Sequence, residues 1–374
     1  MRFTIKREEF LKGLNICSRA VASKTAIAVL ANIKLDLNEE GLYLTGSNYD
    51  LTIKTKIPLK TENGDEIIRN YKEGSALINS KIIVEIARKM DSNEITLEII
   101  DSTIATIGDE KSTYKLNSTR PEEYPDIDLE ENGVSFSLPT AQFSSLVDQT
   151  AFAASIKETR PVLTALNLEA NNGILTATAT DSARMARKEI GIPQELAFNA
   201  NVPAKMIVEV EHLLEGTSSV MIAISDKKAL FKFGNTVVAT RLVAGDYPNT
   251  KNIVPKFTNY NLEVNAQDLM KAIDRANILS IDRENVVDLT MSDEEVRISA
   301  KSSQVGSAVE KIDVFNFNGQ PLQISFNSEF VVSAIRALDS EDVIFQFVGE
   351  MKPFVIKSPT DDSVIQIVTP VRTF

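Results

Sequence analysis

The fold of this chain is decided by a stretch that occurs three times. Residues 79–86 read NSKIIVEI, residues 203–210 read PAKMIVEV, and residues 327–334 read NSEFVVSA. Each copy begins 124 residues after the one before it. Solenoid repeats have periods of about 20–50 residues, whereas this period is the length of a whole domain. The sequence therefore predicts one domain type that is repeated three times.

Each repeat also begins in the same way, with a strand followed by a helix. In the first repeat Phe3 and Ile5 alternate, and Phe10 and Leu14 follow at helical spacing. The same spacings recur in the second and third repeats, followed by strands of strict alternation and, after the second helix, a closing series of strands. Short turns between these strands favour antiparallel pairing. We predict an α+β fold, formed three times.

Two polar linkers separate the repeats. Residues 120–126 and 245–250 each contain a Tyr-Pro pair in a turn-rich run. Proline fixes φ and drives its neighbour towards extended geometry, so these linkers are expected to be stiff. We predict three domains with the boundaries 1–127, 128–250 and 251–374.

The composition is that of an ordinary soluble protein, with 43% hydrophobic and 25% charged residues. No apolar run approaches the length of a membrane-spanning helix, and the N-terminal residues lack the apolar core of a signal peptide. These features predict a cytoplasmic protein. The single cysteine, Cys17, falls on the apolar face of the first helix and is expected to be a small buried hydrophobic residue.

Residues for catalysis are scarce. One histidine, His212, and one cysteine leave nothing for a zinc site, and no phosphate-binding glycine motif is present. His212 lies late in a repeated helix, at a place where the other repeats have no histidine. Asp181 stands in a Thr-Asp-Ser triplet that is typical of a turn at the end of a strand. We predict no enzymatic activity, no cofactor and no metal.

The charge pattern is uneven. The net charge of −12 argues against broad nonspecific binding to nucleic acid. The helices of the first repeat nevertheless carry a net charge of +3, while acidic residues gather in hairpins and linkers. Ordinary solvated helix faces would give the same pattern, so charge alone does not establish DNA binding.

Several short motifs, in this order and spacing, resemble a known family over the whole chain. They are MRFTI at 1–5, LTGSNYDL at 44–51, ATDSARM at 179–185, GDYP at 245–248, SFN at 325–327 and TPVR at 369–372. Together with the threefold repeat, they resemble the bacterial sliding clamp, the beta subunit of the replicative DNA polymerase III holoenzyme.

The resemblance implies a homodimer whose six domains form a ring around duplex DNA, with sheets outside and helices lining the hole. Such a ring is a processivity factor: it slides along DNA without sequence preference and tethers the replicative polymerase. The first repeat of one chain would meet the third repeat of the other. Apolar residues expected at this dimer interface are Ile82, Ile83, Ile86, Ile278 and Leu279. Cations expected to contact DNA are Lys24 above all, then Arg7, Lys12, Arg19, Lys81, Arg88, Lys89, Lys205, Lys271, Arg275 and Arg336.

The resemblance also implies a peptide-binding groove between the second and third repeats. It would take a linear motif rich in Gln, Leu and Phe from polymerases, the clamp loader and repair proteins. The expected groove residues are Leu163, Thr180, Ser182, Ala183, Arg184, Met185, Pro248, Asn252, Ile253, Asn327, Phe330, Met351, Pro353, Ile367, Val368, Thr369, Pro370, Val371 and Arg372.

This chain departs from the family pattern at three places. Ser182 and Ala183 stand where many members have Gly-His, and Thr369 and Val371 stand where others carry methionines. The segment 26–30 lacks the prolines common there. The first two departures are expected to alter the shape of the groove and its peptide preference, and the last the stiffness of a loop near DNA.

Two other classes of function remain open from sequence. A scaffold or adhesion array of three repeats would share the periodicity but would need neither ring closure nor matched groove residues. A hydrolase using Asp181 or His212 would need catalytic partners that the sequence does not supply. Stoichiometry separates the first alternative from a clamp, because a clamp must be dimeric.

Overall fold

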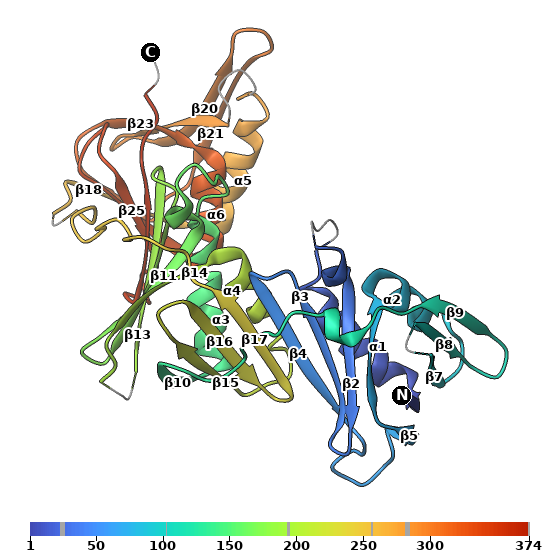
Figure 1. Ribbon diagram of the computed structural model, residues 1–374. Helices are drawn as coiled ribbons and strands as arrows, with labels where there is room; N and C mark the ends of the chain where they lie inside the picture. The colour runs from blue at the N-terminus through green and yellow to red at the C-terminus, as the bar shows by residue number, and fades with distance from the viewer. Residues whose placement is uncertain (23–26, 102, 193–194, 256, 281–284, 373–374) are drawn as a thin grey trace. The chain divides into compact units, whose positions relative to one another are not determined.

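A computed structural model describes residues 1–22, 27–101, 103–192, 195–255, 257–280 and 285–372 (Figure 1). The chain divides into two compact units, Met1–Thr140 with Glu209–Leu242, and Ala141–Val208 with Val243–Phe374. Each unit thus holds one terminal repeat and part of the middle repeat. Among the described residues, no helix is long and apolar enough to cross a membrane.

The first repeat alternates strands with two helices, α1 and α2. Asn79 caps α2 by accepting a hydrogen bond from the backbone nitrogen of Ile82 at 3.2 Å, which explains the asparagine that begins this stretch in the first repeat. The elements are β1 (Arg2–Lys6), α1 (Arg7–Ser18), β2 (Asn32–Asn38), β3 (Gly41–Ser47), β4 (Leu51–Pro58), β5 (Ile68–Lys72), β6 (Gly74–Asn79), α2 (Ser80–Lys89), β7 (Glu94–Ile100), β8 (Ile104–Gly108) and β9 (Thr113–Asn117).

The second repeat follows the same order. Its second helix ends at His212, and Leu213 and Leu214 lie beyond its end. The elements are β10 (Val134–Pro139), α3 (Thr140–Asp148), β11 (Ala165–Asn171), β12 (Ile174–Thr180), β13 (Arg184–Gly191), β14 (Phe198–Pro203), α4 (Ala204–His212), β15 (Ser219–Ile224), β16 (Lys228–Phe233) and β17 (Thr236–Arg241).

The third repeat again places a helix after its first strand and another before its closing strands. Asn327 caps α6 by accepting from the backbone nitrogen of Phe330 at 3.2 Å, as Asn79 does for α2. The elements are β18 (Tyr260–Asn265), α5 (Ala266–Asn277), β19 (Val286–Met291), β20 (Val296–Ser302), β21 (Gly306–Ile312), β22 (Asn316–Asn318), β23 (Leu322–Asn327), α6 (Ser328–Leu338), β24 (Asp342–Phe347), β25 (Phe354–Lys357) and β26 (Val364–Val368).

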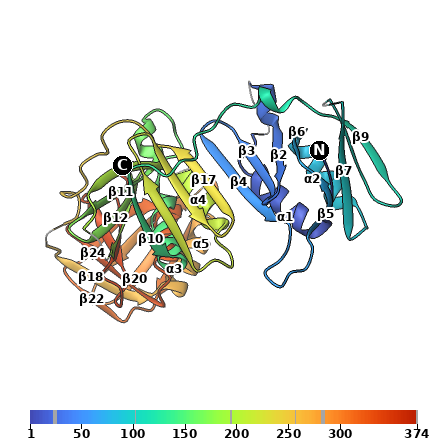
Figure 2. The same cartoon turned by 60° about the horizontal axis from the view of Figure 1, so that its bottom comes forward.

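The strands form antiparallel sheets that run from one repeat into the next. In one unit β5-β1-β7-β8-β9 form a sheet, and β10-β15-β16-β17-β4-β3-β2-β6 form another that joins the first two repeats through β17 and β4 (Figure 2). In the other unit β14-β11-β12-β13-β26-β25-β24-β18-β22 join the last two repeats through β13 and β26. The remaining sheet is β21-β20-β19-β23. The predicted α+β class, with antiparallel strands, is confirmed.

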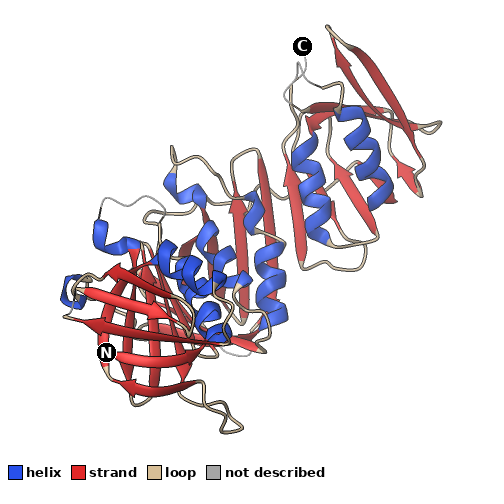
Figure 3. Cartoon of the chain, turned by 90° about the vertical axis from the view of Figure 1, so that its right-hand side faces the viewer, coloured by secondary structure: helices blue, strands red, loops and turns tan. Residues whose placement is uncertain are grey.

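The helices pack on the sheets and on one another (Figure 3). In the first repeat Phe3 and Phe10 are fully buried, and their rings meet edge to face at 5.9 Å. Helix α1 approaches β3 so closely that a Cβ on Gly46 would lie 2.2 Å from the carbonyl oxygen of Cys17. Cys17 is buried, as predicted, and its Sγ donates to the carbonyl oxygen of Leu44 at 3.1 Å.

Candidate functional site

A turn between β12 and β13 forms one wall of the candidate site. Asp181 shapes it, because its Oδ1 accepts hydrogen bonds from the backbone nitrogens of Ala183 and Arg184, both at 2.9 Å. This closure puts Ser182 at a φ of 81°, in the left-handed region that favours glycine. The turn therefore adopts a backbone that a glycine at residue 182 would adopt without strain.

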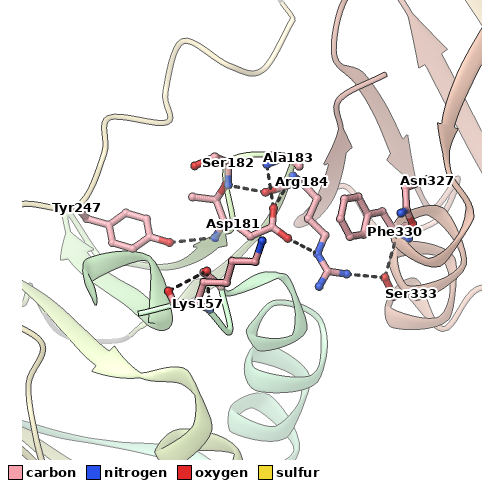
Figure 4. Close-up of polar contacts among 11 residues, drawn as sticks. Lys157, Asp181, Ser182, Ala183, Arg184, Tyr247, Asn327, Phe330 and Ser333 are labelled. Carbon is pink, nitrogen blue, oxygen red and sulfur yellow. Dashed lines mark hydrogen bonds and ion pairs between the residues drawn. The ribbon is translucent and has the colours of Figure 1, made fainter. Parts of the chain in front are cut away.

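Arg184 reaches from this turn to helix α6 (Figure 4). Its Nε donates to Asp181 Oδ2 at 3.1 Å, and its Nη1 donates to Ser333 Oγ at 2.9 Å. The guanidinium also lies over the rings of Phe152 and Phe330, at 5.4 and 4.6 Å from their centroids. Planar stacking and a fork of donors are properties that lysine lacks. Arg184 thus holds α6 of the third repeat against the second repeat.

The linker after β17, residues 245–250, contacts the end of β12. The Tyr247 hydroxyl accepts a hydrogen bond from the backbone nitrogen of Thr180 at 3.0 Å (Figure 4), and burial raises the pKa of Tyr247. Val254 packs on a small apolar cluster made by Met185, Val355 and Ile367. The chain between Tyr247 and Val254 is therefore attached to the sheet at both of its ends.

A cavity of about 190 Å³ opens between the turn, the linker and β26. Met185 and Ile367, which are paired across β13 and β26, are only 2% exposed and form its apolar floor. Of the predicted groove residues, this cavity is lined by Leu163, Thr180, Ser182, Arg184, Met185, Pro248, Ile253, Ile367 and Thr369. A mostly apolar concavity with a few polar groups at its edge can hold the apolar side chains of a peptide.

A second cavity, of about 410 Å³, adjoins the C-terminal segment. Met351, Val371 and Arg372, which are among the predicted groove residues, line it. The segment that follows β26 connects the two cavities, because Thr369 N donates to the carbonyl oxygen of Ala183 at 2.9 Å and Val371 N donates to that of Ser325 at 2.8 Å. The predicted groove residues that line a cavity are thus divided between two cavities that share this segment.

Other predicted groove residues have structural contacts instead of lining either cavity. Val368 is 1% exposed in the core of the third repeat, and Pro370 is also buried. Asn327 caps α6, Phe330 stacks on Arg184, and Ala183 accepts from Thr369. Asn252 is exposed and Pro353 half-buried. Sequence reasoning missed Arg160 and Thr250 in the first cavity, because neither belongs to a recognisable motif.

The predicted DNA-contacting cations that the structure describes all lie on, or next to, α-helices. Arg19, just beyond α1, pairs with Glu209 at 2.8 Å, and Arg275 on α5 pairs with Glu310 at 2.8 Å. The Arg275 guanidinium holds the pKa of Glu310 below its usual value. Lys24 lies outside the described residues. The remaining cations are Arg7 and Lys12 on α1, Lys81, Arg88 and Lys89 on α2, Lys205 on α4, Lys271 on α5 and Arg336 on α6.

In the described ranges no group of three or more His, Cys, Asp or Glu side chains is placed to hold a metal ion. His212 is exposed, with Nε2 3.9 Å from the carboxylate of Glu211. Asp181 is occupied by the turn and by Arg184.

Comparison with known proteins gives a consistent result along the chain. Residues 1–128, 137–249 and 251–372 match family models described as the N-terminal, central and C-terminal domains of the DNA polymerase III beta subunit. The "Beta sliding clamp" of Halalkalibacterium halodurans is 37% identical, and that of Bacillus subtilis 32%, each over the full length of both chains. The crystal structure of the DNA polymerase sliding clamp from Bacillus subtilis superposes with a TM-score of 0.96 at 32% identity, covering all of both chains. The beta subunit of Streptococcus pyogenes gives 0.94 at 28% identity, also over both full lengths.

Proposed function

The chain belongs to the DNA polymerase III beta-subunit family, the sliding clamps, and we propose that two copies of it close head to tail into a ring around duplex DNA. Its function is that of a DNA sliding clamp, a processivity factor.

The strand order of the sheets carries the proposal of a ring. At both junctions within the chain, the third strand after a repeat's first helix pairs with the last strand of the next repeat: β4 with β17, and β13 with β26. The corresponding strands that remain are β21 of the third repeat and β9 of the first, and each lies at the edge of its sheet. Pairing β21 of one copy with β9 of another would repeat the same junction.

Side chains at these edges fit an interface. Val309 on β21 is 65% exposed, and Tyr114 on β9 is 42% exposed. An uncovered edge strand with apolar side chains invites pairing, and closure of a ring would cover it. Of the residues predicted at this interface, Ile82 and Ile278 are well exposed, whereas Ile83 is fully buried within its own repeat. Ile86 and Leu279 are half-buried, and Leu279 packs on the core of the third repeat.

Contact with DNA would be made by helix cations and would be weak. Lys12, Lys81, Lys205, Lys271 and Arg336 are exposed, and within the described ranges none of them has an ion pair. Other predicted cations are partly neutralised, since Arg88 and Lys89 both pair with Glu85. With a net charge of −12, the chain cannot hold DNA by charge alone. Topology would retain the ring, and a few phosphate contacts would allow it to slide.

Partners would bind at the two cavities that share the C-terminal segment. The first cavity has an apolar floor, and the second combines Ile324, Met351 and Val371 with polar residues. Such a lining suits a short motif with Leu and Phe side chains and a Gln, presented by polymerases, the clamp loader or repair proteins. The ring itself would perform no catalysis.

One experiment tests encirclement directly. The protein is loaded by a clamp loader onto nicked circular DNA, and the circles are then linearised. Retention on circles at moderate salt, with release on linearisation, is expected of a closed ring. Equal retention on both forms would contradict the ring and indicate ordinary affinity binding. We also expect the mass in solution to be twice that of the 41.2 kDa chain. A monomeric mass, found for protein assayed with a functional clamp loader, would favour the scaffold alternative.

A further inference from the structure

We propose that β10, the first strand of the second repeat, is a docking edge at which an extended segment of a partner protein adds a strand to the sheet. β10 lies at one end of its sheet and pairs on one side only, with β15. Within the described ranges no strand pairs with its other side, here called the open side. This edge shares no residue with the predicted groove, so the inference goes beyond the proposed function.

The first and third repeats cover the equivalent strand with one of their own. β1 pairs with β7 on one side and with β5 on the other, and β18 pairs with β24 and β22 in the same way. Each covering strand belongs to a connection, which is residues 59–73 in the first repeat and 313–321 in the third. The corresponding connection of the second repeat is only residues 192–197, and its described residues form no strand. The second repeat is therefore the one in which this place is open to another chain.

The first repeat shows which backbone groups of β10 face the open side. Lys6, the last residue before α1, faces the covering segment, because its backbone nitrogen donates to the carbonyl oxygen of Ile67 at 3.0 Å. Pro139 has the same place in β10, as the last residue before α3. Backbone groups point to alternate sides along a strand. Ser137 and Ser135 therefore also turn their N–H and C=O groups to the open side.

The third repeat gives the same assignment. Glu263, two residues before the end of β18, accepts a hydrogen bond through its carbonyl oxygen from the backbone nitrogen of Phe315 at 2.9 Å. Ser137 has this place in β10. Ser135 and Ser137 are both exposed. An accessible strand whose outward N–H and C=O groups face no other strand is a template for the addition of an extended peptide.

The covering strands of the other repeats indicate which segment fits. Both are antiparallel to the strand that they cover. β5 places Ile68, which is 3% exposed, opposite Ile5, and β22 places Phe317 opposite Leu262, against the core of the third repeat. Polar residues stand next to these apolar ones in both strands. We therefore expect an antiparallel partner segment with an apolar residue opposite a buried residue of β10 and polar residues beside it.

Acidic residues before β10 favour a segment with a basic C-terminal end. Asp128 is paired with Lys228 at 2.6 Å, whereas Glu130 and Glu131 are exposed and have no ion pair in the described part of the chain. The C-terminal end of an antiparallel partner lies beside the start of β10, and so beside these two carboxylates. The covering strand β5 has this character as well, since it ends with Lys72.

Pro139 limits the length of the site. It has no N–H to donate, whereas Lys6 donates to the covering segment from the same place. Proline is tolerated in edge strands for this reason, and it restricts pairing along the edge. Pairing is thus left to Ser135 and Ser137, which suits a short segment of about five residues.

The test uses the chain's own covering strand as the probe. A fluorescently labelled peptide with the sequence IIRNYK, residues 67–72, is blocked at both ends and titrated with the full-length protein. We expect a dissociation constant on the order of 100 µM by anisotropy, as a few backbone hydrogen bonds and one apolar contact would give. The same peptide N-methylated at its arginine should bind about tenfold more weakly, because it loses a backbone donor to the edge.

Two variants of the protein locate the binding. Ser137→Pro removes the outward N–H of β10 and should weaken binding of the peptide by about tenfold or more. Ser137→Ala is the matched control, because it keeps the N–H, and it should leave the affinity unchanged. Hydrogen exchange on the unmodified protein gives a second measurement should Ser137→Pro fail to fold. The peptide should slow exchange in residues 134–139 and leave the inner strand β20 unchanged.

Three results would overturn the proposal. The first is the absence of peptide binding, and the second is equal binding by both Ser137 variants without slower exchange in residues 134–139. The third is a mass in solution that rises above that of the ring with concentration and returns to it in Ser137→Pro, because a second copy of this chain would then occupy the edge. None of these results bears on the groove, whose own test uses a different peptide.

Discussion

The two junctions within the chain have the same backbone and different surfaces. At the first junction β4 pairs with β17, and at the second β13 pairs with β26, in the same register. The turns before β4 and β13 are also alike. Asn48 and Asp181 each accept hydrogen bonds from the backbone nitrogens two and three residues further along the chain. Tyr49 and Ser182, at equivalent places, both have positive φ. Only the second junction carries the predicted groove.

Side chains account for the difference. The pair Met185 and Ile367 of the second junction corresponds to Thr52 and Ala239 of the first, which are much smaller. The linkers differ as well. Tyr124 of the first linker packs on Leu30 and Leu77, whereas Tyr247 of the second hydrogen-bonds to Thr180 at the rim of the cavity. A repeated backbone thus supplies the frame for a site, and a few substitutions decide whether it is filled or open.

The largest expected effect comes from giving the second junction the residues of the first. We expect Met185→Thr with Ile367→Ala to weaken binding of a motif peptide by about 100-fold or more, because the apolar floor is removed. The free energy of unfolding should fall by about 3–6 kcal/mol from the cavity that remains. Anisotropy and urea unfolding measure the two effects.

The matched control for this double variant is Thr52→Ala at the first junction, which should leave peptide affinity unchanged. Peptide binding that survives in the double variant, once it is shown to be folded, would mean that the groove lies elsewhere. Single variants at residues 185 and 367 allow the comparison to be made if the double variant is too unstable.

A smaller loss of stability is expected from Arg184→Leu. This variant places leucine where the first junction has Leu51. The variant removes hydrogen bonds to Asp181 and Ser333 and the stacking on two aromatic rings, and it leaves a half-buried carboxylate without its cation. We expect the free energy of unfolding to fall by about 2–3 kcal/mol, and by less in Arg184→Lys. Equal stability of both variants and the unmodified protein in urea would show that Arg184 does not join the two repeats.

A gain in stability is expected from Ser182→Gly. Replacement by glycine relieves a left-handed backbone at a residue with a side chain, and should raise the free energy of unfolding by about 0.5–1 kcal/mol. Ala183→Gly in the same turn is the control, because Ala183 does not have a positive φ, and it should lower stability. A lower stability of Ser182→Gly would mean that the Ser182 side chain contributes more than the strain costs.

The smallest effect is expected at Cys17, which reports on the first repeat alone. Burial raises the pKa of its thiol to about 12, so that only about one thiol in ten thousand is ionised at pH 8. A thiol reagent should therefore react slowly with the native protein and fully in denaturant. The rate should be the same in the Met185→Thr variant, because that change lies in the other unit. Faster labelling there would show that the two units unfold together.

The sequence by itself determined the threefold repeat, the α+β class and the family. Alternation and helical spacing in each repeat depend on neighbours along the chain, and the same signals recur 124 residues apart, which makes each repeat a check on the others. Cys17 was likewise predictable, because its place on the apolar face of α1 follows from helical spacing. The chain's membership of the sliding-clamp family, its fold class and its function as a DNA clamp are confirmed. The domain boundaries and the site residues remain predictions.

Only the tertiary structure decided which of the site residues line a cavity and which are packed. Val368 and Ile367 are neighbours in sequence, but the alternation of β26 places one in the core and the other in the floor of the groove. Arg160 and Thr250 line the cavity from loops, and loops have no periodic pattern of apolar residues in the sequence. Arg187 lies opposite Thr178 because β12 and β13 pair side by side, and no local sequence pattern specifies which strands pair.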